Sequence, residues 1–208
     1  NHKSQITKMK NKLFLALLMT TFVFNAQAQN SEGTSVATVG LGYSFFNNII
    51  KTSLESYTEV EVKSVPTIAI TFDHSLTDNF SLGFAGAYQS VTGEFTNTYF
   101  DENFNSQTET AKTSISRINI AIRPLFHYGN SDKLDMYSGL RVGYLIRNVT
   151  VESDDPNGVF LDDLDGNRFA LGLVPFGFRY FFSDNLGINM DLQIGTPYVV
   201  SGGVAFQF

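Results

Sequence analysis

The last eleven residues of the chain alternate between two kinds of side chain. One parity is aromatic, aliphatic or glycine, namely Tyr198, Val200, Gly202, Val204, Phe206 and Phe208, whereas the other is small or polar. Because side chains alternate between the faces of a strand, this pattern predicts a strand over residues 198–208 with one apolar face. The ends of soluble domains tend to fray. An aromatic ending suits a membrane barrel better, because the apolar face meets lipid while the strand pairs with the first strand.

The same alternation recurs upstream at regular intervals. It predicts strands at about 35–46, 65–74, 80–89, 117–127, 135–146, 169–180 and 186–195. Short turns at 75–79, 129–133 and 181–185 alternate with longer polar connections at 47–63, 92–112 and 148–167, and a brief link at 196–197 precedes the last strand. No helix is expected after residue 28. The sequence therefore predicts an all-β fold, an eight-stranded antiparallel up-and-down transmembrane β-barrel.

The strand at 169–180 is the least certain in parity. Leu171 and Leu173 favour one face, whereas Val174, Phe176 and Phe178 favour the other. We place Arg179 inward, because a lipid-facing arginine costs roughly 2–4 kcal/mol near the middle of the bilayer.

The first residues of the sequence have the features of a secretory signal peptide. A short basic segment begins at Met9, an apolar run follows at 13–24, and Ala26-Gln27-Ala28 forms an A-x-A cleavage site. We expect cleavage before Gln29, so that residues 1–28 are removed and residues 29–208 form the barrel domain. The apolar run is too short to cross a bilayer as a helix.

Charge and cysteine content narrow the classes of function. The formal net charge is −6, and removal of residues 1–28 would take away four of the 14 basic residues and none of the 20 acidic ones. Nucleic acid is therefore not expected as a partner. The sequence has no cysteine, so we expect neither disulfides nor thiolate metal sites. No motif predicts a cofactor.

The terminal Phe208 and the alternating residues before it resemble the small eight-stranded outer-membrane barrels of Gram-negative bacteria, the OmpA/OmpX type. This resemblance implies a location in the bacterial outer membrane after export, with lipid and lipopolysaccharide as surroundings. It also implies that Tyr198, Val204, Phe206 and Phe208 form the signal read by the barrel-insertion machinery, after delivery by periplasmic chaperones. Both termini would face the periplasm, and the barrel would be a monomer.

A soluble barrel or sandwich of the lipocalin type is the competing architecture. Its apolar parity would point inward and its polar parity outward. The polar parity consists mainly of Gly, Ala, Ser, Thr and Asn and contains hardly any Lys or Glu. Such residues fit a narrow interior better than a solvated face, which usually carries more charge. We therefore favour the membrane barrel.

The inward parity collects most of the charges that fall within strands. They are Asp73, Arg117, Arg123, Asp135, Arg141, Arg179 and Asp191. Charges in so narrow a space should pair. Eight strands leave room for little beyond side chains, so we favour a salt-bridged plug over a small polar pore. A fully paired network would indicate a plug, and an unpaired ladder of arginines would indicate a path.

The connection at 148–167 is the most acidic part of the chain. Asp154, Asp155, Asp162, Asp163 and Asp165 form a possible weak cation-binding loop. Their spacing does not match the twelve-residue calcium loop, so solvated turn residues are the favoured interpretation, and no metal is assigned.

An enzyme is not expected. A serine nucleophile needs a base, and after residue 28 the chain has only His74 and His127, both placed at the turn ends of strands. We therefore expect a structural or surface-interaction protein that displays acidic extracellular loops. The alternative is a small passive channel through the Arg/Asp-lined lumen, and a weaker one is an enzyme that modifies envelope lipids.

Overall fold

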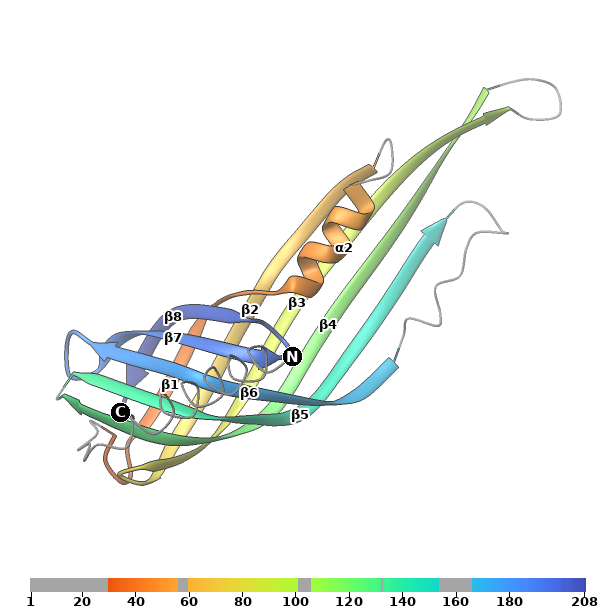
Figure 1. The fold of residues 1–208 in the computed structure, drawn as a ribbon. Coiled ribbons are helices and arrows are strands. Elements are labelled where there is room, and N and C mark those ends of the chain that lie inside the picture. Colours follow the sequence, from red (N-terminus) through yellow and green to blue (C-terminus); the bar gives the residue numbers. More distant parts are fainter. Residues whose placement is uncertain (1–29, 56–59, 101–105, 132, 154–165) are drawn as a thin grey trace, which may run out of the picture.

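The strands of this protein form a closed barrel in a computed structural model that describes residues 30–208, apart from 56–59, 101–105, 132 and 154–165 (Figure 1). Each strand pairs antiparallel with the next, and β1 pairs with β8 to close the sheet. The strands are β1 (Ser35–Tyr43), β2 (Val60–Thr77), β3 (Phe80–Phe100), β4 (Ser106–Ser131), β5 (Leu134–Ser153), β6 (Gly166–Phe181), β7 (Leu186–Gly195) and β8 (Val200–Gln207). This confirms the predicted fold class.

The apolar parity of the strands faces outward. Ile70, Phe84, Ile120 and Leu171 are more than half exposed, whereas their neighbours in sequence point into the barrel and are buried. A soluble cup would show the reverse arrangement. The outward side is therefore suited to contact with lipid, and the buried side chains are the polar ones inside the barrel.

The chain closes the barrel with its last residues. Val204, Phe206 and Phe208 face outward as predicted, and the backbone of Phe208 exchanges two hydrogen bonds of 2.9 Å with Ser35. The Phe208 ring lies 6.0 Å from that of Phe72, on β2. Tyr198 differs from the prediction. It precedes β8, and its side chain turns into the lumen, where it is almost fully buried.

Four neighbouring strands are much longer than a membrane requires. β2 to β5 contain 18, 21, 26 and 20 residues, compared with 9 in β1, 10 in β7 and 8 in β8. About 9–11 residues span the hydrocarbon core. The surplus lies at one end of the barrel, where β3 and β4 continue far beyond the other strands (Figure 1). We call this the hairpin end, and the end with Asn30, Phe208 and the short turns the turn end.

Much of the expected connection at 92–112 is therefore strand and not loop. The register continues through Thr92↔Ser114 and Glu94↔Lys112, and a salt bridge of 3.4 Å joins Lys112 to Glu152 on β5. Threonine favours strands, and cross-strand pairs of opposite charge support the ladder. The sequence-based boundaries were wrong here because the apolar side chains of this part, Val91, Phe95 and Ile115, follow the inward parity, whereas the predicted strands carry theirs on the outward parity. The same extension shortens the expected connection at 148–167.

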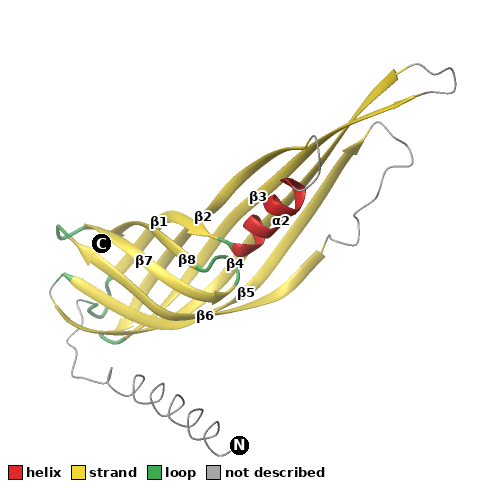
Figure 2. Ribbon diagram, turned by 45° about the horizontal axis from the view of Figure 1, so that its top comes forward, coloured by secondary structure: helices red, strands yellow, loops and turns green. Residues whose placement is uncertain are grey.

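A helix, α2 (Phe45–Glu55), occupies most of the expected polar connection at 47–63, where no helix was predicted. It packs against the long strands β2 and β3 (Figure 2). Phe46 and Ile50 have the i, i+4 spacing of one helix face and are partly buried. Asn47 Nδ2 donates a 2.9 Å hydrogen bond to the Val65 carbonyl. No helix in the described part of the chain is long and apolar enough to cross a membrane.

A β-bulge resolves the uncertain parity of β6. The register with β7 shifts between Leu173 and Phe176. Leu171 and Leu173 face outward before the bulge and Phe178 lies on the outer side after it, so the apolar pattern changes parity at the bulge. Val174 is fully buried and does not share the face of Phe178. Arg179 points inward, as placed from the sequence.

Candidate functional site

The centre of the barrel lumen holds an alternating set of arginines and carboxylates. Arg123 Nε lies 3.3 Å from Asp73, and its Nη1 lies 3.4 Å from Asp191. Arg179 contacts Asp73 through Nη2, and its Nη1 lies 3.2 Å from Asp135. All five side chains are at most 3 % exposed. Each guanidinium therefore bridges two carboxylates, which offsets the cost of removing these charges from water.

Tyr137 fills the space between these ion pairs. It is fully buried, and its hydroxyl donates a 2.5 Å hydrogen bond to Asp191. The guanidinium carbons of Arg179 and Arg123 lie 4.7 and 5.5 Å from its ring centroid. The aromatic face thus adds cation–π attraction to the network, and we call these six residues the lumen network.

Two glycines allow side chains two strands apart to meet. Gly83 lies between Asp73 and Arg123 in the cross-strand register, and Gly177 lies between Tyr137 and Asp191. A β-carbon on Gly83 would collide with the Asp73 carboxylate, and one on Gly177 would collide with the Tyr137 ring. The inward parity therefore alternates large charged residues with glycine, so that each long side chain has room to lie across its neighbour.

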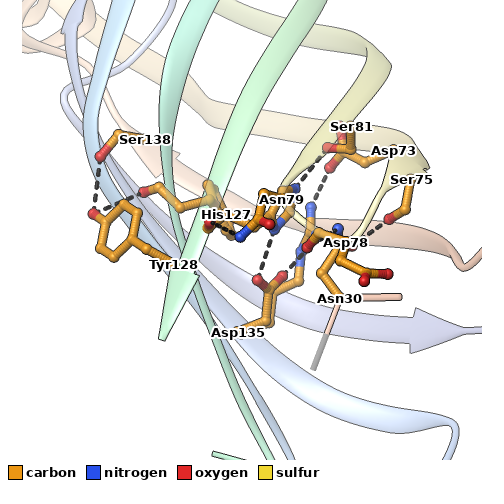
Figure 3. Close-up of polar contacts among 12 residues, drawn as sticks. Asn30, Asp73, Ser75, Asp78, Asn79, Ser81, His127, Tyr128, Asp135 and Ser138 are labelled. Atoms are coloured by element: carbon orange, nitrogen blue, oxygen red, sulfur yellow. Dashed lines mark hydrogen bonds and ion pairs between the residues drawn. The ribbon is translucent and has the colours of Figure 1, made fainter. Parts of the chain in front are cut away.

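Ser81, His127 and Asp135 form a hydrogen-bonded row on the turn-end side of this network (Figure 3). Ser81 Oγ lies 2.7 Å from His127 Nε2, and His127 Nδ1 lies 2.7 Å from Asp135 Oδ1. The order of groups is that of a serine hydrolase. All three side chains are buried, however, and the second Asp135 oxygen is occupied by Arg179. Sequence reasoning did not connect Ser81 with His127, because 46 residues separate them.

Asn30 covers the turn end of the lumen. Its Nδ2 donates to the carbonyls of Thr77 and Asp78 at 3.3 and 3.2 Å, and its Oδ1 accepts from the Ser75 hydroxyl. Figure 3 shows Asn30 beside Ser75 and Asp78. The segment that precedes β1 is thereby attached to the first short turn.

Arg141 belongs to a separate layer, nearer the hairpin end. Its Nη1 donates a 2.8 Å hydrogen bond to the Tyr198 hydroxyl, and its Nη2 donates a 3.0 Å bond to Asn119 Oδ1. The Tyr198 hydroxyl lies 3.5 Å from Asp191 Oδ2. This explains why Tyr198 does not face lipid: its hydroxyl links Arg141 to the lumen network.

Arg117 lies apart from the other predicted lumen charges. It is 4 % exposed and points into the hairpin end, where the Phe46 ring of α2 lies 4.0 Å from its guanidinium carbon. In the described part of the chain, no carboxylate pairs with it and its Nε has no hydrogen-bond partner. The structure thus brings six of the seven predicted charges into connected layers and leaves Arg117 separate.

The remaining predicted site cannot be placed. Asp154, Asp155, Asp162, Asp163 and Asp165 all lie outside the described residues. Among the residues that are described, no group of three or more His, Cys, Asp or Glu side chains is arranged to hold a metal ion.

Comparison with known protein families shows to which family this barrel belongs. Residues 14–199 match the family described as the outer membrane protein beta-barrel domain. The chain belongs to this family. The protein is therefore a barrel of the bacterial outer membrane, and lipid surrounds its apolar face.

The chain is also similar to several solved structures. The outer membrane protein OprG of Pseudomonas aeruginosa is 11 % identical, with a TM-score of 0.50 over 88 % of this chain and 99 % of its own. Ail, the attachment invasion locus protein of Yersinia pestis, is 11 % identical, with a TM-score of 0.43 over 85 % of this chain and 99 % of its own. The N-terminal barrel of Pseudomonas aeruginosa OprF is 14 % identical, with a TM-score of 0.39 over 86 % and 98 %. A comparison with the curated proteins found no match.

Proposed function

We propose that this protein is a non-conducting outer-membrane barrel with a structural or surface-interaction role, and that its long β3–β4 hairpin is displayed outside the cell. The observation that carries this proposal is the lumen network. Arg123, Arg179 and Tyr137 join carboxylates on β2, β5 and β7, so ion pairs cross the lumen from several sides. A solute would have to break buried ion pairs in order to pass.

The geometry of the β3–β4 hairpin supports its proposed display outside the cell. In this family type the termini lie in the periplasm, which would place the hairpin end outside. The β3–β4 ladder is paired as far as Phe100↔Ser106, so it is a stiff projection and not a flexible loop. A stiff projection loses little conformational entropy when it binds a partner. We further propose that the chain works as a monomer, is inserted by the barrel-insertion machinery, and has no enzymatic activity.

A small channel is the second candidate. It is favoured by Arg117, whose buried charge has no carboxylate partner among the described residues, and by Arg141, whose described partners are neutral. These residues would form the hairpin-end part of a path. The lumen network would still close that path toward the turn end, unless it rearranged.

Single-channel conductance in a planar bilayer tests the two functions. The refolded protein, shown to be folded by its heat-dependent shift in gel mobility, is expected to be silent. A triple variant of Asp73, Asp135 and Asp191 to Asn serves as the comparison, because loss of the ion pairs should loosen the plug. Discrete openings of the unmodified protein that disappear in Arg117→Gln, Arg123→Gln and Arg141→Gln would overturn the plug and establish the channel.

A further inference from the structure

A groove lies on the lipid-facing side of the barrel, where β8 runs between β1 and β7. Gly202 is the cross-strand partner of Leu41 on one side and of Met190 on the other. Both partners carry long apolar side chains, whereas Gly202 carries none. The nearest described atom to a β-carbon on Gly202 would be the Asn189 carbonyl oxygen at 3.6 Å, an ordinary contact distance. The missing side chain therefore leaves a hollow in the apolar outer wall.

The size and walls of this groove suit an apolar ligand. Its volume is about 610 Å³, and its walls also include Tyr43, Phe178, Ile188 and Val200. Ligand sites typically measure about 300–1,000 Å³ and have mainly apolar walls. Because lipid surrounds the outward face of this barrel, the molecule available to fill the groove is a lipid. The part of a lipid that matches apolar walls is its acyl chain.

A second, polar pocket lies beside the groove, where β1 ends. It has a volume of about 190 Å³ and is lined by residues of β1, β2 and the first two turns of α2. Gly42 and Tyr43 line both the groove and the pocket, so the two cavities lie on either side of the last residues of β1. One water needs about 10–15 Å³, so the pocket has room for a small polar group.

Asn47 gives this pocket an unused hydrogen-bond acceptor. Its side chain is 9 % exposed, and its Nδ2 bond to the Val65 carbonyl fixes the amide. Its Oδ1 has no hydrogen-bond partner among the described residues. A buried acceptor without a partner is unfavourable, and a ligand group that donates a hydrogen bond would satisfy it. Lys51 also lines the pocket but already takes part in an interaction within the chain, so it is not assigned to the ligand.

The end of β1 lies at the depth where lipid head groups are expected. β1 has 9 residues, and about 9–11 residues span the hydrocarbon core. The exposed rings of Tyr43 and Phe45 follow at its end, 5.6 Å apart. Aromatic residues gather at the membrane interfaces of barrels. The groove is therefore at the depth of the acyl chains, and the polar pocket is at that of the head groups.

We propose that the groove and the pocket together bind one membrane phospholipid whose head group donates a hydrogen bond. An acyl chain fills the groove over Gly202, and the head group reaches past Tyr43 to Asn47 Oδ1. The ammonium group of phosphatidylethanolamine can donate to this oxygen, whereas the fully methylated head group of phosphatidylcholine cannot. The site therefore distinguishes two lipids that have the same acyl chains and the same net charge.

Native mass spectrometry of the purified full chain in an uncharged detergent tests the site, with phosphatidylethanolamine and phosphatidylcholine of identical acyl chains as probes. One phosphatidylethanolamine should bind at least about tenfold more tightly than phosphatidylcholine, since a hydrogen bond to a charged group contributes about 1.5–3 kcal/mol. Monomethyl and dimethyl phosphatidylethanolamine keep a donor and should bind more tightly than phosphatidylcholine. Equal affinity for all four lipids would overturn the proposal.

Variants test the two cavities separately. Gly202→Phe fills the groove with a ring and should remove the bound lipid, and it should fold because that ring lies on the outward face. Leu82→Phe is the matched control, because it places the same ring on the outward face of β3, outside the groove, and lipid binding should be unchanged. Asn47→Leu should keep lipid binding and lose the preference for phosphatidylethanolamine. If Asn47→Leu displaces α2, the methylated lipids still measure that preference in the unmodified chain.

A second copy of the chain is the alternative occupant of the groove. The same spectra detect it, since a lipid-free dimer that Gly202→Phe dissociates would assign the groove to another protomer and would contradict the lipid site. Unchanged lipid binding in Gly202→Phe would do so as well. Lipid affinity depends neither on whether the lumen conducts nor on which end of the barrel faces outside, so this test is independent of the proposed function.

Discussion

Arg179 on β6 forms a buried ion pair with Asp73 on β2, 106 residues earlier in the chain. In a closed barrel of eight strands in sequence order, β2 and β6 stand on opposite walls. The pair therefore spans the lumen, and Arg123 approaches the same carboxylate from β4. One acidic residue thus connects three walls of the barrel.

Loss of the Asp73 carboxylate should lower the stability of the folded barrel. Asp73→Asn removes the charge that Arg123 and Arg179 share, and breaking a buried pair from one side typically costs about 3–5 kcal/mol. We expect the urea midpoint of unfolding in lipid or detergent micelles to fall accordingly. Asp184→Asn, in the exposed turn between β6 and β7, is the control and should leave the midpoint unchanged. Adding Arg179→Met to Asp73→Asn should recover part of the loss, and a double variant no more stable than Asp73→Asn would contradict this account.

The inward glycines should not tolerate even a methyl group. Gly177→Ala places a β-carbon against the Tyr137 ring. Tyr137 would have to leave its hydrogen bond to Asp191, so we expect a loss of about 1–3 kcal/mol in unfolding free energy, typical of overpacking. Gly202→Ala is the matched control, because its nearest atom would be the Asn189 carbonyl oxygen at 3.6 Å. Equal stabilities for the two variants would show that the lumen is not close-packed at Tyr137.

The orientation of the barrel can be read from single cysteines, because the natural chain has none. Thr110→Cys, on the β4 side of the projecting hairpin, should react with a membrane-impermeant maleimide in intact cells. Asn185→Cys, in a turn at the opposite end, should react only after the outer membrane is opened. Both positions are exposed, so their reactivity reports on the side of the membrane. The opposite pattern would place the hairpin in the periplasm and remove the basis for a surface role.

The buried Ser81–His127–Asp135 row should be chemically inert. Ser81 is 1 % exposed, and its neighbour His127 is fully buried. A serine-reactive fluorophosphonate should therefore leave the folded protein unlabelled, as it should leave Ser81→Ala unlabelled. Labelling of the folded protein that is absent from Ser81→Ala would establish a reachable nucleophile and would reopen the question of an enzyme.

Alternation of apolar and polar residues was sufficient to predict the eight strands and their faces, because the environment on each side of the sheet acts on every second residue. The predicted inward positions of Arg123 and Asp135 follow from that period alone, whereas the position of Arg179 was predicted from the cost of a lipid-facing arginine. The ladder beyond Thr92 was not recognised in this way, because its outward face is polar and its apolar residues, such as Phe95, lie on the inward parity. The α2 helix was also missed, since its stability depends on contacts with β2, β3 and Arg117 and only weakly on its own sequence.

Partners across the lumen were decided by the tertiary structure. The parity of a residue in its strand predicts whether its side chain points inward. Register, strand tilt and the space left by Gly83 and Gly177 decide which strand on the other side of the lumen that side chain reaches. Tyr198 shows the difference: its parity matches the outward set, yet it precedes β8 and turns inward to Arg141. The sequence by itself determined the period, the strands and the charges that lie inside. Only the closed barrel decided which charges pair, and that Arg117 has no carboxylate partner among the described residues, because pairing depends on distances between strands far apart in the chain.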